Sequence, residues 1–192
     1  MIRVLIGSVV AAVAMLIIGF LFWATPLAGL GMDSADDGQA AAIQQALAAN
    51  LRETGTYQIP SIGTQAQTNM YSRGPIATIH YNMGGFAAED LSGMLGGLVL
   101  NLVTALLIGA ALLGIDRRVP DLASRARVAV IIAVAAAAYC SLGTPIYWHH
   151  DWGHAIYVFV TDALALVAAG LIMAWFLPRA SAAAEDATAR AE

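Results

Sequence analysis

Four long apolar runs constrain this chain more than any other feature, because each is long enough to cross a lipid bilayer. The runs are Val4–Ala24, Leu91–Gly114, Val128–Leu142 and Ala155–Leu177. About 20 apolar residues, rising about 1.5 Å each in a helix, span a hydrocarbon core of about 30 Å. The pattern predicts an all-α integral membrane protein, built as a bundle of four transmembrane helices.

The composition agrees with a chain surrounded by membrane lipids. Of the 192 residues, 59% are hydrophobic and 11% are charged, whereas a soluble domain carries about 25% charged residues. A charge in hydrocarbon costs several kcal/mol, which explains the deficit. The net charge of −4 provides no broad basic surface, so we expect no nucleic-acid partner. The single cysteine, Cys140, excludes a disulfide within the chain.

The lengths of the first and third apolar runs decide how each is interpreted. The first is longer than the apolar stretch of about 7–15 residues in a secretory signal, so we expect an uncleaved signal anchor over residues 1–24. The third is short, at about 22 Å, and reaches a full span only if its helix continues to Tyr147. We therefore expect spans over residues 91–114, 128–147 and 155–177.

The arginines are distributed unevenly along the chain. Seven of the nine fall at the N-terminus, in the loop 115–127 or in the tail 178–192: Arg3, Arg117, Arg118, Arg125, Arg127, Arg179 and Arg190. Short cytoplasmic loops carry such an excess of basic residues. The count predicts a multi-pass protein of the bacterial inner membrane with both termini in the cytoplasm, and it places residues 25–90 and 148–154 outside.

Residues 25–90 form the one sizeable polar stretch. Within it, Ser34–Leu51 predicts a helix that begins after Ser34 or Asp36. Thr54–Ile59 and Ile76–Asn82 are rich in β-branched and aromatic residues and predict two strands, whereas the polar segment Ser61–Ser72 predicts a loop. We expect a small extracytoplasmic α+β cap, a helix plus a β-hairpin, between the first two spans.

Small residues recur along the second span. Gly93, Gly97 and Asn101 lie four residues apart and share one helix face. Glycines at this spacing let two helices approach closely, and an asparagine can hydrogen-bond across the contact. The pattern predicts helix packing, either within the bundle or against a partner protein or a second copy.

The outer loop holds a cluster of histidines. His149, His150 and His154 surround Asp151, and His80 lies in the cap on the same predicted side. Imidazole and carboxylate groups are ligands for zinc and related metals. The alternative is an interfacial loop whose aromatic residues anchor it at the lipid headgroups. A haem or divalent metal is therefore one hypothesis for this loop.

Asp162 is an ionisable residue inside the fourth span, on the same face as His154. Such residues are costly in the membrane, and they usually face a bundle interior, a partner or water. One interpretation is a proton path from His154 to Asp162. The other is a hydrogen-bonded carboxyl that fixes helix packing with Asn101 or Tyr139.

No hydrolase or nucleotide-binding motif accompanies these residues, since the sequence contains no GxSxG, SxxK, P-loop or Rossmann pattern. The leading hypothesis is a non-enzymatic inner-membrane protein without a cofactor, acting as an accessory subunit, assembly factor or scaffold. It implies a membrane-protein partner or self-association. The alternatives are a haem- or metal-binding protein that uses the histidines, and a small proton-coupled transporter that uses Asp162.

Overall fold

The structure is a computed structural model that describes residues 2–87 and 90–177. The predicted tail 178–192 and Glu89 lie outside the described residues. The chain divides into a bundle unit, which includes residues up to Asp33 and from Leu91 onward, and a cap unit, Ser34–Asp90. Residues 25–33, which the sequence grouped with the cap, belong to the bundle unit and include a short 3-10 helix, η1, at Pro26–Leu30.

Four helices of the bundle unit are long and apolar enough to cross a membrane, which indicates a multi-pass membrane protein. They are α1 Ile2–Trp23, α4 Leu91–Gly114, α5 Leu122–Trp148 and α6 Trp152–Phe176. The four predicted helices are thereby confirmed. Helix α5 also extends beyond its apolar run at both ends, so the connection that precedes it is shorter than predicted.

Helix α5 continues through Pro145, as a full span requires. Proline has no N–H, so the carbonyl oxygen of Ser141, four residues earlier, loses its usual helical partner. The Thr144 hydroxyl donates a hydrogen bond of 2.9 Å to that oxygen. The helix therefore passes the proline without leaving the Ser141 carbonyl unpaired, and it ends at Trp148.

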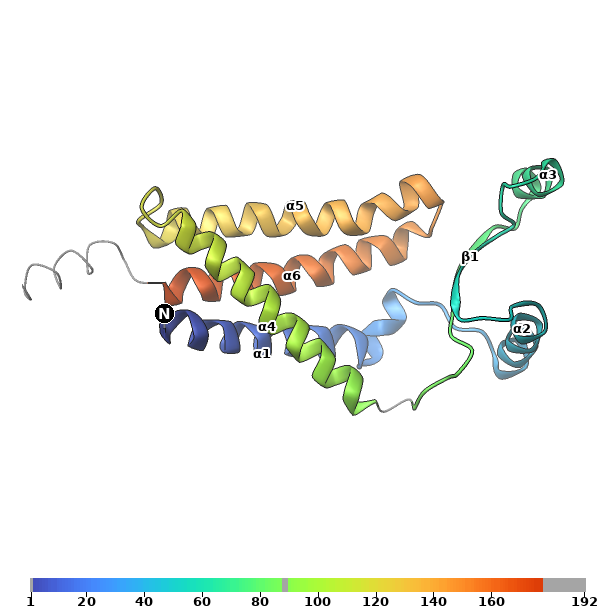
Figure 1. Ribbon diagram of the computed structural model, residues 1–192, viewed down its shortest axis with the longest axis horizontal. Helices are drawn as coiled ribbons and strands as arrows, with labels where there is room; N and C mark the ends of the chain where they lie inside the picture. Colours follow the sequence, from blue (N-terminus) through green and yellow to red (C-terminus); the bar gives the residue numbers. More distant parts are fainter. Residues whose placement is uncertain (1, 88–89, 178–192) are drawn as a thin grey trace, which may run out of the picture. The chain divides into compact units, whose positions relative to one another are not determined.

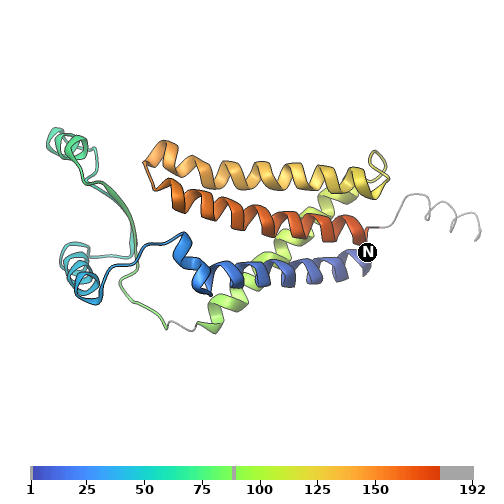
Figure 2. The same cartoon turned by 180° about the vertical axis from the view of Figure 1, so that it is seen from behind.

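Helix α6 is the central element of the bundle, because it packs against α1, α4 and α5. Helix α4 crosses α1 and α6 obliquely, as both views show (Figure 1 and Figure 2). It contacts α1 and α6 far more than it contacts α5. The three buried residues of α4 are Ala105, Gly109 and Leu112, which all lie in its C-terminal part. The N-terminal part of α4 consequently contributes little to the buried interior.

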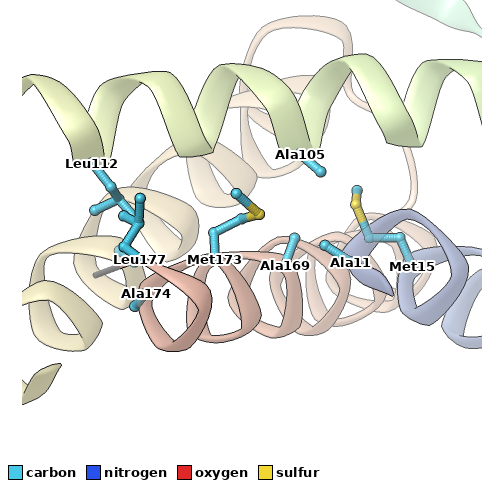
Figure 3. Close-up of a cluster of buried hydrophobic side chains, with 9 residues drawn as sticks. Ala11, Met15, Ala105, Leu112, Ala169, Met173, Ala174 and Leu177 are labelled. Atoms are coloured by element: carbon cyan, nitrogen blue, oxygen red, sulfur yellow. The ribbon is translucent and has the colours of Figure 1, made fainter. Parts of the chain in front are cut away.

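Alanines make up most of the buried core, together with Met15, Met173, Leu112 and Leu177. Met173 is fully buried and extends from α6 towards α4, where it lies between Leu112 and Ala105 (Figure 3). A β-carbon on Gly109 would lie 2.5 Å from the Met173 Cε atom, and one on Gly170 would lie 2.9 Å from the Ala129 Cβ atom. A β-carbon at Gly170 would push against the short Ala129 side chain and so against its helix, whereas one at Gly109 would displace the flexible end of the Met173 side chain; the glycines thus allow the helices to approach closely.

The five bundle arginines that the structure describes gather at one end of the helices. Residues near the start of α1 and the end of α6 meet there, since a β-carbon on Gly7 would lie 2.8 Å from the Phe176 Cβ atom. The connection between α4 and α5 reaches the same end, because Arg125 contacts the Leu177 carbonyl oxygen. The arginines are Arg3, Arg117, Arg118, Arg125 and Arg127.

The cap unit contains α2 Asp37–Asn50, β1 Gly55–Ile59, α3 Gln65–Arg73 and β2 Ala77–Tyr81. The two strands pair in antiparallel register, with Tyr57 opposite Ile79, and the predicted strands are confirmed. The predicted helix is confirmed with Asp36 as its N-cap, in a capping box with Gln39. The predicted loop at 61–72 is wrong in part, because Thr64 caps the helix α3.

The cap has no buried core of its own. None of its described residues, 34–87 and 90, is buried. Helices α2 and α3 lie at opposite ends of the strand pair rather than on its face (Figure 1). The apolar pairs of the sheet, including Tyr57 with Ile79, are consequently only partly covered.

Candidate functional site

A cluster of aromatic and polar side chains joins the end of α1 to the start of α6, at the end of the bundle away from the arginines. The His154 Nδ1 atom lies 2.7 Å from the Gly31 carbonyl oxygen, and because a carbonyl only accepts, this nitrogen carries the proton. The Tyr157 hydroxyl donates a 2.6 Å hydrogen bond to the Phe22 carbonyl oxygen. Both contacts tie α6 to the segment that follows α1.

Trp23 completes the cluster by edge-on ring contacts. Its ring centroid lies 5.3 Å from that of Tyr157 and 6.4 Å from that of His154. Gly31 is buried and lies against the Tyr157 side chain, where a β-carbon would collide with the Cβ, Cγ and Cδ1 atoms. The close approach of Gly31 thus brings its carbonyl oxygen within reach of His154. The cluster holds two helix ends together, and His154 has a structural role in it.

The histidines of the connection between α5 and α6 have different environments. His149 is exposed and ends α5 in the left-handed conformation, with φ 55°. His150 precedes α6, and its Nε2 atom is buried without a hydrogen-bond partner in the described part of the chain. Asp151 caps α6 by accepting the His154 backbone N–H at 2.6 Å. His150 and His154 therefore do not share one turn of a helix.

His80 belongs to the cap unit, where its Nδ1 atom lies 3.0 Å from the Thr56 hydroxyl oxygen. Among the described residues, the structure brings no three histidine, cysteine, aspartate or glutamate side chains into a group that could hold a metal. Within the bundle unit, the described part of the chain does not assemble His149, His150 and His154 into a metal site. A metal or haem at these residues and His80 stays a prediction.

Asp162 lies deeper in α6 than the sequence indicated, because the helix begins at Trp152 rather than at Ala155. The Ser141 hydroxyl of α5 donates to the Asp162 carboxylate at 3.5 Å. The predicted partners were wrong: Tyr139 is 86% exposed, and neither it nor Asn101 hydrogen-bonds this carboxylate.

The predicted packing face of α4 is used little within the chain. A β-carbon on Gly97, or on its neighbour Gly96, would meet nothing within 4 Å. Gly93 is exposed and Asn101 is half-buried. Close packing inside the bundle occurs instead at Gly109, one turn of α4 after Ala105. Packing of the Gly93–Gly97–Asn101 face against another protein stays a prediction.

Arg125 is a residue whose role the sequence did not reveal. Its side chain is 1% exposed, although the sequence pattern placed it only among the basic residues of a cytoplasmic loop. The Nε atom donates to the Val119 carbonyl oxygen at 2.9 Å, and an Nη1 atom lies 3.5 Å from the Leu177 carbonyl oxygen. Arg125 thereby connects the segment before α5 to the end of α6. Its position on the same α5 face as Ala129 and Ala133 was the available signal.

Asp121 is a second such residue, at the start of α5. Its carboxylate accepts the Ser124 backbone N–H at 2.8 Å. Hydrogen bonds from the Ser124 side chain and backbone hold the pKa of the exposed Asp121 carboxyl below its usual value of 3.8. The spacing of Asp121 and Ser124 before an apolar run is a recognisable helix start.

The geometry describes structural contacts at both ends of the bundle, one carboxylate midway along it, and two incompletely covered surfaces, on α4 and on the cap. Comparison of the chain with protein-family models, with curated proteins and with solved structures finds no match.

Proposed function

We propose that this protein is a non-enzymatic accessory subunit, assembly factor or scaffold of a membrane complex in the bacterial inner membrane. The observation that carries the proposal is the cap, whose described residues include none that is buried. A module without a core gains stability when a partner covers its apolar side chains. The cap is therefore the part of the chain that binds another protein.

The sheet of the cap supports this role. An isolated two-stranded sheet is at best marginally stable in water, and it needs further strands or a packed helix. Its two faces differ: Tyr57 and Ile79 lie on one, whereas Thr56 and His80 lie on the other. Neither α2 nor α3 covers the apolar face (Figure 1). A protein partner that packs on the Tyr57 face would supply the missing contacts.

The second supporting observation is on α4. A β-carbon on Gly96 or Gly97 would meet nothing within 4 Å, whereas the space beside Gly109 is occupied by the Met173 side chain. Association of helices in lipid depends on close backbone approach, because lipid tails are as apolar as leucine. The N-terminal part of α4 thus offers a surface for a helix of the same partner.

Both termini are proposed to be cytoplasmic and the cap extracytoplasmic. The support is the end of the bundle where the arginines gather, because positively charged loops remain in the cytoplasm. Fusions of a periplasm-active and a cytoplasm-active reporter at residues 60 and 120 test this. We expect residue 60 outside and residue 120 inside, and the same compartment for both would contradict the orientation.

The function is tested by affinity purification of the full chain from native membranes in a mild detergent. We expect a stoichiometric membrane-protein partner with the unchanged chain and much less of it with Gly97→Leu or Tyr57→Ser. The matched control is Ala110→Leu, which introduces the same leucine side chain at an exposed position of α4 on another face. Recovery of the unchanged chain as a partnerless monomer would contradict the proposal.

A further inference from the structure

Asp162 is the one carboxylate in the interior of the four long helices. It follows Trp152 by ten residues, or about 15 Å of helix, which is about half of a hydrocarbon core of about 30 Å. The residue is only partly buried, at the seam between α5 and α6. A group in this position faces the surroundings of the bundle as well as its interior.

The chain satisfies this carboxylate poorly. Its one hydrogen-bond partner among the described residues is the Ser141 hydroxyl at 3.5 Å, whereas O–H···O bonds are usually about 2.7–2.8 Å long. The described arginines of the bundle lie at the opposite end of the helices, where Arg125 contacts the Leu177 carbonyl oxygen. An ionised carboxylate in lipid is expensive unless an opposite charge or several donors accompany it.

We infer that Asp162 is the docking point for an arginine or lysine in a transmembrane helix of a partner protein. The inference rests on the proposed function and specifies the chemistry of that partner. Charge complementarity selects this occupant: a partner helix that crosses the same bilayer brings a basic side chain to the depth at which the carboxylate needs one.

The side chains around Asp162 are compatible with a helix at this position. Ala165, one turn further along α6, and Ala138, one turn before Ser141 on α5, are small and half-buried. Small residues allow another helix to approach the seam. Ser141 orients the carboxylate from the inner side and leaves the other oxygen atom for the partner.

The test uses photocrosslinking of the full chain in native membranes. A photoreactive benzoylphenylalanine replaces Val158, which lies one turn before Asp162 on the same face. The matched control replaces Leu164, which lies at a similar depth on the opposite face and is 47% exposed. Crosslinked proteins are identified by mass spectrometry, and their spans are inspected for arginine or lysine.

We expect the Val158 probe, and not the Leu164 probe, to capture a protein with a basic residue inside a span. Asp162→Asn should lower the yield about tenfold, which corresponds to about 1.4 kcal/mol, whereas Asp162→Glu and Ser141→Ala should retain most of it. Replacing the partner's basic residue with glutamine, with this chain unchanged, should cause the same loss. The substitution in the partner remains a decisive test even if Asp162→Asn impairs the folding of this chain.

Three results would overturn the inference: a crosslink that persists after both neutralising substitutions, a captured protein without a basic residue in its spans, or capture of lipid alone. Affinity purification from the same membranes separates the two ideas. If the partner is recovered equally with Asp162→Asn, the inference fails and the proposed function stands. If the unchanged chain recovers no partner, both fail.

Discussion

The Tyr157 hydroxyl of α6 donates a 2.6 Å hydrogen bond to the Phe22 carbonyl oxygen at the C-terminal end of α1. A side chain of one long helix thus provides a hydrogen-bond donor for a terminal carbonyl of its neighbour. The four terminal carbonyls of a helix have no partners within that helix. In an apolar environment, an unpaired carbonyl is costly. Tyr157 therefore stabilises the contact between α1 and α6 through its hydroxyl as well as its ring.

Removing this hydroxyl should weaken the bundle. We expect Tyr157→Phe to lower the free energy of unfolding in detergent by about 1 kcal/mol, because the ring contacts remain and one hydrogen bond is lost. Tyr139→Phe is the matched control, since Tyr139 is 86% exposed. Denaturant unfolding followed by tryptophan fluorescence measures both. Equal stabilities of the two variants would show that the Phe22 carbonyl does not depend on Tyr157.

Filling the contact between α5 and α6 should be more damaging. A β-carbon at Gly170 meets the Ala129 Cβ atom at 2.9 Å, so Gly170→Val should cost about 1–3 kcal/mol by overpacking. Gly19→Val is the control, because a β-carbon at Gly19 meets nothing within 4 Å. Thermal unfolding in detergent compares them, and a larger loss for Gly19→Val would be inconsistent with the observed packing.

Arg125 should contribute to the stability of the bundle although it lies in the first turn of α5. Arg125→Met removes the hydrogen bonds to the Val119 and Leu177 carbonyls, and we expect a loss of about 1.5–3 kcal/mol. Arg127→Met removes the same charge from an exposed position and should change stability by less than about 0.5 kcal/mol. If both variants lose the same stability, net charge rather than the buried contact is responsible.

Asp121 should make the start of α5 sensitive to acid. Its folded pKa is lowered from 3.8, first by the hydrogen bond with the Ser124 side chain, so its charge stabilises the fold above that value. The stability difference between the unchanged chain and Asp121→Asn should be small and constant at neutral pH. It should disappear as the pH falls below 3.8 through the folded pKa. If the stability difference instead grows as the pH falls, the folded state does not lower the pKa of Asp121.

The histidines should respond differently to substitution. His154→Ala should cost about 1 kcal/mol because the Gly31 carbonyl loses its donor. His150→Ala should be neutral or slightly stabilising, since its buried Nε2 atom makes no hydrogen bond within the described residues. Unfolding with and without added zinc measures both. Zinc stabilisation that either substitution abolishes would instead support the predicted metal site.

Local patterns explain which elements were predictable. The four long helices follow from apolar length, and β1 and β2 follow from β-branched and aromatic residues such as Thr56 and Ile79. Helix α3 was missed because its polar residues form no apolar stripe. The pair Thr64 and Gln67 provided a capping signal that could have located it, since the Thr64 hydroxyl accepts the Gln67 N–H.

The sequence by itself determined the number of long apolar helices, the uneven placement of arginines and the separation of a polar cap. Only the tertiary structure decided that Asp162 faces Ser141, that Arg125 is buried, and that Gly109 rather than Gly97 is filled within the chain. Apolar length and charge are properties of one segment. A contact between helices depends on their crossing angle and axial offset, which the side chains of two segments set together.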